Sequence, residues 1–391
     1  MKKINNFYDT IVDLKKIQSM YDRRIKLNTK NKQKLERFEN NYVSNMIYIK
    51  EILENKNYTP RRYNLFIIDE PKVRLIMSQN IIDKIINHLV TEYFLINVFE
   101  KSLIEENIAT RKNKGTHYGI KLLKKYLNEI KHNNFYILKF DVEKYFFNID
   151  HNIVKDIIRT KIKDKDVLNL LDKIIDSSDE EYVNQEIAKL KEKHINKLID
   201  SKNNNAINKI NDIKKIPIYK KNKGVPIGNM SSQFIAILYL NELDHFIKEK
   251  LKVKYYIRYM DDGIILHEDK EYLKYCLKEI KKIINKYKLN LNSKTQIINI
   301  KQGFEFLGFK YHIKNNKIIM KVKNQTKRRF KRKIKKLNIL LNNNKITLED
   351  FNQIKSSYLA HLSHGNTKKL IHKNINIKKV NIDLGNSIRI N

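Results

Sequence analysis

Three aspartates in this sequence have the types and positions that phosphoryl-transfer chemistry requires. Asp141 follows the apolar run 134–140, and Asp261 and Asp262 lie together in the apolar segment 254–267. Two adjacent carboxylates repel each other unless a cation lies between them. Magnesium favours one or two carboxylates plus substrate phosphates, and two such ions can activate a hydroxyl and stabilise a leaving phosphate. The alternative is a solvated hairpin turn, because Asp-Gly is itself a strong turn signal.

The elements that must position these acids are predicted from periodicity and from turn residues. Residues 134–140 predict a strand that leads into Asp141, and residues 254–267 predict a hairpin with the acids at its turn. With only nine glycines and four prolines, the rest of the chain should be mostly helical. We expect helices within 1–60, 80–100, 151–176, 231–250 (amphipathic) and 323–375, a hairpin at 63–79 around Glu70-Pro71-Lys72, short strands at 304–322, and a charge-rich helical excursion or mobile insertion at 178–216.

The charge balance points to a polyanionic partner. Lys and Arg number 80 against 43 Asp and Glu, a formal net charge of +37. Nucleic acid is the obvious candidate, because each neutralised phosphate releases counterions. Part of the excess can also reflect compositional drift, since Lys, Asn and Ile are all over-used.

Cysteine usage and hydropathy indicate a cytoplasmic protein without a membrane segment. The single Cys276 excludes an internal disulfide and a CxxC zinc site. The N-terminal residues lack an uninterrupted apolar run, so we expect no signal peptide. No apolar run approaches the length that spans a membrane.

Two segments resemble motifs of reverse transcriptases. FDVEKYFFNIDH (140–151) resembles motif A, and YMDD (259–262) resembles motif C. The resemblance covers about residues 60–370, with six motifs in the expected order. It implies an α+β right-hand polymerase fold with fingers, a palm built on a small antiparallel sheet, and a helical thumb. The implied domains are an N-terminal helical extension (1–60), fingers (61–135), palm (136–312, with the charged insertion 178–216), thumb (313–375) and a C-terminal tail (376–391).

The resemblance also implies a catalytic site. Asp141 and Asp261 would bind two Mg²⁺ ions, with Mn²⁺ as a substitute, and the backbone of Val142 would support one of them. Asp262 would shape the site and bind more loosely. Phe146, five residues after Asp141, would be the steric gate that selects dNTPs over rNTPs. The alternatives are core packing of Phe146, or Tyr145 as the gate.

Further motifs imply contacts with the incoming nucleotide. GVPIGNMSSQ (224–233) resembles motif B, so Gly228, Ser232 and Gln233 would lie near the nascent base pair. Its IGxxxSQ form resembles reverse transcriptases of diversity-generating retroelements and some phage-defence enzymes, and is associated with low fidelity. Lys72 and Arg74 in EPKVR would bind the triphosphate; the alternative is that they are solvated cations. Lys294 in motif D would protonate the departing pyrophosphate; the alternative is a surface lysine without a catalytic role.

The remaining motifs imply contacts with template and primer. They comprise a fingers block (Arg111, Lys112 and Lys114), a primer grip (Phe306, Leu307 and Gly308) and a basic thumb helix (Arg328, Arg329, Arg332 and Lys333). Contacts made by the thumb helix should be to phosphate and sugar. SSYLAHLSHGNTKKL (356–370) also recurs in similar bacterial enzymes, and we expect His361 and His364 within it to be structural.

We therefore expect a bacterial RNA-directed DNA polymerase. Its partners would be dNTPs, an RNA template, a DNA product and, in an antiphage defence system, a structured noncoding RNA, with a partner protein or a second copy of the chain as further options. The alternatives are a low-fidelity enzyme of a diversity-generating retroelement, a catalytically idle RNA-binding scaffold on this fold, and an RNA-dependent RNA polymerase, against which Phe146 argues.

Overall fold

The computed structural model describes residues 7–69, 72–200, 206–367 and 370–371. The chain divides into two compact units assembled from interleaved stretches of sequence, the first from 1–115, 139–264 and 274–295, and the second from 116–138, 265–273 and 296–391. The predicted domain limits describe a different division and remain predictions. The predicted hairpin turn at Glu70 and Pro71, and the predicted tail 376–391, lie outside the described residues.

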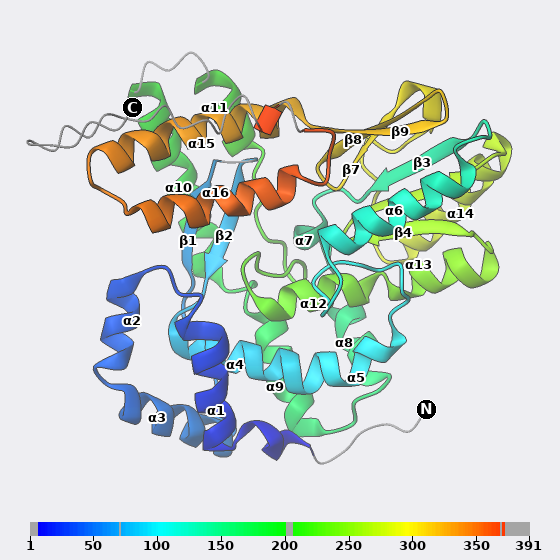
Figure 1. Ribbon diagram of the computed structural model, residues 1–391. Helices are drawn as coiled ribbons and strands as arrows, with labels where there is room; N and C mark the ends of the chain where they lie inside the picture. The colour runs from blue at the N-terminus through cyan, green and yellow to red at the C-terminus, as the bar shows by residue number, and fades with distance from the viewer. Residues whose placement is uncertain (1–6, 70–71, 201–205, 368–369, 372–391) are drawn as a thin grey trace, which may run out of the picture. The chain divides into compact units, whose positions relative to one another are not determined.

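The first unit begins with short helices, as predicted for 1–60 and 80–100. Side chains cap their first turns: Asp13 accepts a hydrogen bond from Lys15 N, and Asn80 accepts one from Asp83 N at 2.8 Å. The elements of this part are η1 Tyr8–Ile11, α1 Leu14–Met20, η2 Tyr21–Lys26, α2 Lys32–Glu39, α3 Tyr42–Glu54, α4 Ile81–Leu89, η3 Val90–Ile96, α5 Asn97–Phe99 and η4 Glu100–Ser102 (Figure 1).

The predicted hairpin forms from β1 (Asn64–Ile68) and β2 (Arg74–Ser78), which are antiparallel with Leu65 opposite Met77. The predicted excursion is helical and comprises α10 (Glu181–Asp200) and α11 (Ala206–Lys214). It is anchored on the hairpin, because Val183, Ile187 and Ile213 share one hydrophobic cluster with buried residues of both strands. The described part of the excursion is therefore packed against the β1–β2 hairpin.

A four-stranded sheet has the strand order β4-β5-β3-β6. Its strands are β3 (Tyr136–Asp141), β4 (Tyr255–Tyr259), β5 (Asp262–His267) and β6 (Gln296–Asn299), so both predicted acid-bearing segments are confirmed as strands. The associated helices are α7 Tyr145–Asn148, α8 His151–Arg159, α9 Lys165–Asp176, α12 Met230–Tyr239, α13 Asn241–His245, η5 Phe246–Lys250 and α14 Lys270–Lys286.

The prediction of one amphipathic helix over 231–250 was wrong in two respects. The helix α12 ends at Tyr239, and α13 begins at Asn241. The run 234–239 is buried on every side, because FIAILY is apolar throughout and lies in the core of the first unit. Between Phe234 and Leu240 no polar face is exposed, and the polar positions resume in the segments that follow Leu240.

The second unit holds α6 (Thr116–Ile130), η6 (Ile300–Gln302), a three-stranded antiparallel sheet and two helices. The strands β7 (Phe304–Phe306), β8 (Phe309–Lys314) and β9 (Lys317–Val322) confirm the short strands predicted at 304–322. The basic segment forms α15 (Asn324–Asn342) and α16 (Leu348–Leu362). The helix α15 buries Phe330, Ile334 and Leu337 along one face, so its basic side chains lie mainly on the other faces.

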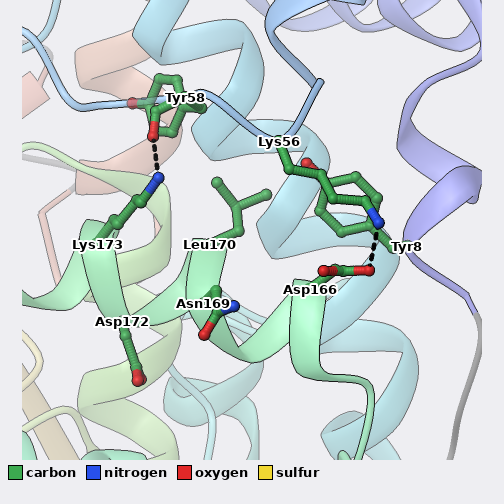
Figure 2. A pocket seen from close by; sticks show the side chains of 8 residues that line it. All are labelled: Tyr8, Lys56, Tyr58, Asp166, Asn169, Leu170, Asp172 and Lys173. Carbon is green, nitrogen blue, oxygen red and sulfur yellow. Dashed lines mark hydrogen bonds and ion pairs between the residues drawn. The ribbon is translucent and has the colours of Figure 1, made fainter. Parts of the chain in front are cut away.

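A cavity of about 290 Å³ lies in the first unit between η1, α9 and the segment that joins α3 to β1 (Figure 2). Its charged side chains bind to their neighbours: Lys56 pairs with Asp166 at 2.6 Å, and Lys173 donates to the Tyr58 carbonyl at 2.9 Å. These contacts identify it as a polar gap between packed elements. No helix among the described residues is both long and apolar enough to cross a membrane.

The largest fully buried side chain in the described part of the chain belongs to Arg258 on β4. It forms an ion pair with Asp244, also fully buried, with Nη2 2.5 Å from Oδ2. Arg258 also donates to the carbonyl oxygens of Ile237 (2.9 Å) and Met260 (2.6 Å). The pair therefore links α12 and α13 to the turn that carries Asp261.

We predict that Arg258→Leu lowers the free energy of unfolding by about 3–5 kcal/mol, because it leaves the Asp244 carboxylate buried and unpaired. Urea unfolding followed by circular dichroism measures the change. The control is Lys50→Leu, which removes an exposed Lys50–Glu54 pair and should cost about 0–1 kcal/mol. Equal losses in the two variants would contradict the assignment.

Candidate active site

Strand pairing brings Asp141 and Asp261 together. Asp141 ends β3, and Asp261 occupies the turn between β4 and β5, which is the neighbour of β3 in the sheet. The two carboxyl groups lie within hydrogen-bonding reach of each other. Burial, together with the charges of Asp141 and Asp262, raises the pKa of the Asp261 carboxyl to about 7. Two neighbouring carboxyl groups do not readily both ionise, because their negative charges repel each other. A divalent cation would offset this repulsion, so Asp141 and Asp261 fit a metal site.

Asp262 points to a different partner. Its Oδ1 lies 3.4 Å from Lys139 Nζ. The three carboxylates do not bring ligand atoms within 4.8 Å of one another in the described structure. The geometry thus supports a two-carboxylate centre with Asp262 beside it. Val142 is buried next to Asp141, and its role as a backbone ligand stays a prediction.

The turn that carries Asp261 is tight. Met260 adopts a positive φ of 57°, and its carbonyl is held by Arg258. After the turn, Gly263 lies so close to the Phe140 ring that an added Cβ would be 2.2 Å from Cζ. Only glycine fits there, which lets β5 lie close against β3 just beyond the acids.

Asn292 orients Asp141, a contact that the sequence did not predict. Its side-chain amide donates to Asp141 Oδ2, and its backbone N–H donates to the Asp141 carbonyl at 2.8 Å. Glu143 N donates to the Asn290 carbonyl at 2.9 Å, so residues 290–292 run alongside the end of β3. Lys294 follows two residues later and is exposed.

The structure distinguishes Phe146 from Tyr145. Tyr145 is 2% exposed, and its hydroxyl donates to the Ala236 carbonyl at 2.6 Å. Phe146 is only partly buried, and its carbonyl accepts from Val225 N at 2.8 Å. Tyr145 is thus part of the core, and Phe146 is the better placed of the two to meet a nucleotide.

Position 228 requires glycine for two reasons, its backbone conformation and the close contact with the β1–β2 hairpin. Its φ is +136°, and an added Cβ would lie 2.6 Å from the Met77 carbonyl oxygen. Next to it, the Ile227 carbonyl accepts from Met77 N at 2.9 Å. The loop 224–228 is therefore joined directly to β2. On α12, Gln233 is exposed, whereas Ser232 is buried.

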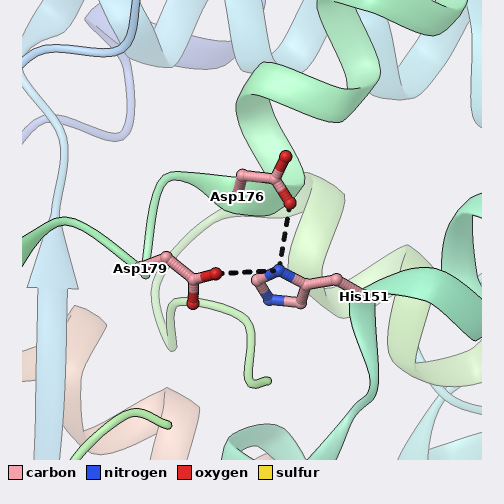
Figure 3. Close-up of side chains that lie close together, drawn as sticks. All are labelled: His151, Asp176 and Asp179. Carbon is pink, nitrogen blue, oxygen red and sulfur yellow. Dashed lines mark hydrogen bonds and ion pairs between the residues drawn. The ribbon is translucent and has the colours of Figure 1, made fainter. Parts of the chain in front are cut away.

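His151, which the sequence motif contained but which we did not predict as a site residue, holds the start of this loop (Figure 3). Its buried ring places Nε2 2.6 Å from the Gly224 carbonyl oxygen and Nδ1 3.1 Å from Asp176 Oδ1. Asp179 Oδ2 lies 3.7 Å from Nδ1. The neighbouring groups supply donors to both carboxylates, because Lys155 binds Asp176 (2.7 Å) and Asn222 N binds Asp179 (2.8 Å). The cluster therefore acts as a structural clamp on the start of the loop.

The predicted triphosphate ligands Lys72 and Arg74 are both exposed. Arg74 is the first residue of β2, and Lys72 lies in the bend two residues before it.

Two of the three predicted template contacts in the fingers block point inward. Arg111 is 6% exposed in its side chain and binds Glu100 (2.7 Å) and the Asn107 carbonyl (2.8 Å). Lys114 is 10% exposed and pairs with Glu105. Both side chains hold their own loop, so their placement does not support a template contact. Lys112 is exposed and remains a candidate.

In the second unit, Phe306 is buried, and Leu307 and Gly308 form the turn between β7 and β8 with φ values of 48° and 86°. His361 lies against this turn, with its ring 4.9 Å from that of Phe309. On α15, Arg328 and Arg332 are exposed, and Arg329 and Lys333 are partly buried. Their contacts with a primer or duplex remain predictions.

A family model described as "Reverse transcriptase (RNA-dependent DNA polymerase)" matches residues 67–311, more than half of the chain. The chain belongs to the reverse transcriptase family. It is an RNA-directed DNA polymerase of the right-hand fold, and in general terms such an enzyme copies an RNA template into DNA with the help of divalent metal ions.

Other comparisons add little to the assignment of this reverse transcriptase. No curated protein matches the sequence. One solved structure that aligns with it is the apo telomerase of Candida tropicalis truncated from its C-terminal domain, at 14% identity and a TM-score of 0.44. The alignment covers 71% of this chain and 60% of that chain. The likeness is too distant to transfer anything from that protein.

We predict that Gly228→Ala slows nucleotide incorporation by about 10- to 100-fold, because the new Cβ displaces either the loop or the hairpin. Single-turnover primer extension measures the rate. The control is Gly115→Ala, which also has a positive φ (+105°) but has no atom within 4 Å of the added Cβ. If both variants lose the same rate, backbone strain and not the contact with Met77 explains the effect.

We predict that Mg²⁺ raises the melting temperature more at pH 8 than at pH 5.5. The pKa of Asp261 is raised in the folded state, so the contribution of this group to metal-free stability is fully present below its unfolded pKa of about 4 and is lost as the pH rises through about 7. A bound cation relieves this loss. Melting curves in EDTA and in Mg²⁺ test the difference, and Asp261→Asn should remove most of it. A Mg²⁺ effect that does not depend on pH would contradict the prediction.

Proposed function

We propose that this reverse transcriptase extends a primer by two-metal phosphoryl transfer, with Asp141 and Asp261 holding two Mg²⁺ ions. The observation that carries the proposal is the facing pair of carboxyl groups at the ends of neighbouring strands. When bound, the two cations would lower the barrier by activating the primer 3′-hydroxyl and stabilising the leaving pyrophosphate. Asn292 would keep Asp141 turned towards the site.

The other residues would position and select the nucleotide. Lys72 and Arg74 would bind the triphosphate, where the guanidinium can make a forked contact. The partly exposed ring of Phe146 would clash with a ribose 2′-hydroxyl and so favour dNTPs. Lys294 would donate a proton to the departing pyrophosphate. Gly228 and Gln233 would lie against the new base pair.

In the second unit, the thumb helix and the primer-grip turn would hold the template–primer duplex. The exposed cations of α15 lie opposite its buried face, which suits contacts with phosphates. We propose that the template is a structured noncoding RNA and that the enzyme serves bacterial antiphage defence. The +37 charge and the anchored α10–α11 hairpin, which offers a surface for RNA or a partner, support this role.

A diversity-generating role is the second candidate. The IGxxxSQ form of motif B supports it, because it resembles that of diversity-generating retroelement enzymes and is associated with low fidelity. Sequencing the nucleic acid that co-purifies with the protein separates the two roles. A single structured RNA with its complementary DNA supports defence. Copies with frequent substitutions at one template base support diversification.

We predict that Asp261→Asn abolishes nucleotide incorporation and leaves RNA affinity nearly unchanged, because it removes a metal ligand and no RNA contact. Primer extension and filter binding measure the two properties. The control is Asp269→Asn, an exposed aspartate beyond β5 that should leave both unchanged. Normal incorporation by Asp261→Asn in Mg²⁺ would refute the proposed site.

We predict that Phe146→Ala allows incorporation of rNTPs, because removing the ring opens space for the 2′-hydroxyl. The ratio of kcat/KM for dNTP and rNTP should fall by at least about tenfold. The matched control is Phe147→Ala, whose ring packs against Tyr219 at 4.7 Å and should affect stability more than selectivity. If Phe146→Ala polymerises dNTPs and stays as selective as the parent, the gate lies elsewhere.

A further inference from the structure

The second unit contains a polar groove of about 490 Å³ whose function the polymerase site does not explain. Its walls come from α6, from the turn between β8 and β9, and from the segment that follows α16. The polar side chains that line it are Lys124, Asn128, Lys131, Asn316, Lys317, His364 and Asn366.

The segment after α16, which carries the SHGNT sequence, forms a fixed wall of this groove. Asn366 pairs with β9, since its N–H donates to the Met320 carbonyl at 2.7 Å and its side-chain oxygen accepts from Met320 N at 2.9 Å. Gly365 allows the close approach, because an added Cβ would lie 3.1 Å from the Met320 carbonyl oxygen. Lys124 donates to the His364 carbonyl at 3.0 Å and ties the segment to α6. A segment so closely bound to two elements is well suited to shape a binding site.

The groove is electropositive. Three lysines line it, and no carboxylate is among its lining residues. Glu129 lies on the same helix but outside the lining. The pKa of His364 is lowered by burial and by the nearby His117 and Lys124, which agrees with a cationic environment. A concave surface with clustered cations attracts anions and concentrates them.

The spacing of the lysines favours a ligand with repeated anionic groups. Lys124 lies on α6, and Lys131 directly follows its last residue, Ile130, so the two are seven residues or roughly 10 Å apart along the helix direction. One tetrahedral anion does not readily bridge that span, whereas successive phosphates of a strand do. The asparagine amides can donate and accept hydrogen bonds, as contacts with sugars and phosphates require. The lining offers little apolar surface that a folded protein partner would cover.

We propose that this groove binds the phosphodiester backbone of a nucleic-acid strand, as a site separate from the thumb helix. It gives the SHGNT segment a role that the polymerase motifs leave unassigned. The site would retain a template or product strand by contacts that do not depend on base sequence. The proposal does not depend on the assignment of the catalytic aspartates.

The test compares the full-length parent with the triple variant Lys124→Ala, Lys131→Ala, Lys317→Ala. A triple variant on α14, Lys278→Ala, Lys281→Ala, Lys282→Ala, makes the same charge change on exposed lysines outside the groove. Fluorescence anisotropy with a labelled 30-nucleotide RNA, over a salt series, gives the affinity and its salt slope. Matching arms use DNA of the same sequence and poly-glutamate.

We expect the groove variant to lose about tenfold in nucleic-acid affinity and to flatten the salt slope by about two to three units, one for each lost phosphate contact. The α14 variant should lose less than twofold. If the groove variant loses more affinity for RNA than for DNA, the groove binds an RNA strand. If the two losses are equal, it binds either kind of strand. Equal losses in the two triple variants, or no loss in the groove variant, would overturn the proposal. If the groove variant loses poly-glutamate binding as strongly as RNA binding, the proposal is also overturned, because the ligand would then be an acidic protein.

A second variant keeps the test independent of folding. Asn366→Asp retains the oxygen that accepts from Met320 N and adds a negative charge to the groove. It should weaken RNA binding at least threefold while melting within about two degrees of the parent. Unchanged RNA binding by this variant would also count against the proposal.

Discussion

The arrangement of the catalytic centre depends on holding Asp141 and Asp261 next to each other against their mutual repulsion. The sheet supplies the proximity, because β3 and β5 are neighbours and both acids lie where these strands begin or end. Buried polar contacts supply the rigidity: Arg258 holds the turn through the Met260 carbonyl, and Asn292 holds Asp141. The raised pKa of Asp261 is the electrostatic consequence, and in the proposed mechanism a divalent cation bound to the pair would relieve it.

The loop 224–229 is the second point on which the site depends. His151 binds the carbonyl of Gly224 at one end, and Asn229 at the other end donates to Tyr63, whose hydroxyl contacts Ser177 at 2.8 Å. Residues 176–179 are therefore linked to both ends of the loop, through His151 and through Tyr63, before the chain continues into α10. The α10–α11 hairpin thus follows directly from the segment that braces this loop.

The sequence predicted the local elements well, because apolar runs around Pro71 and around Gly263 mark the hairpins at 63–79 and 254–267. It also predicted that Asp141 and Asp261 lie close together, and their strands are neighbours in the sheet; their role as metal ligands stays a prediction. It did not reveal contacts between distant segments. Arginine is usually a surface residue, but Arg258 is buried against Asp244. Arg111 and Lys114 bind acidic residues next to their own loop. In a chain with 80 basic residues, residue type alone does not separate the cations that bind nucleic acid from those that hold the fold.

The central proposal is a metal centre shared by Asp141 and Asp261, and anomalous diffraction tests this proposal most directly. Crystals of the enzyme with an RNA template, a primer, a non-hydrolysable dNTP and Mn²⁺ would locate the ions. The account predicts Mn²⁺ peaks within coordination distance, about 2.0–2.3 Å, of both carboxylates. Peaks only at other sites, such as His151 with Asp176 and Asp179, and none between Asp141 and Asp261 would contradict it.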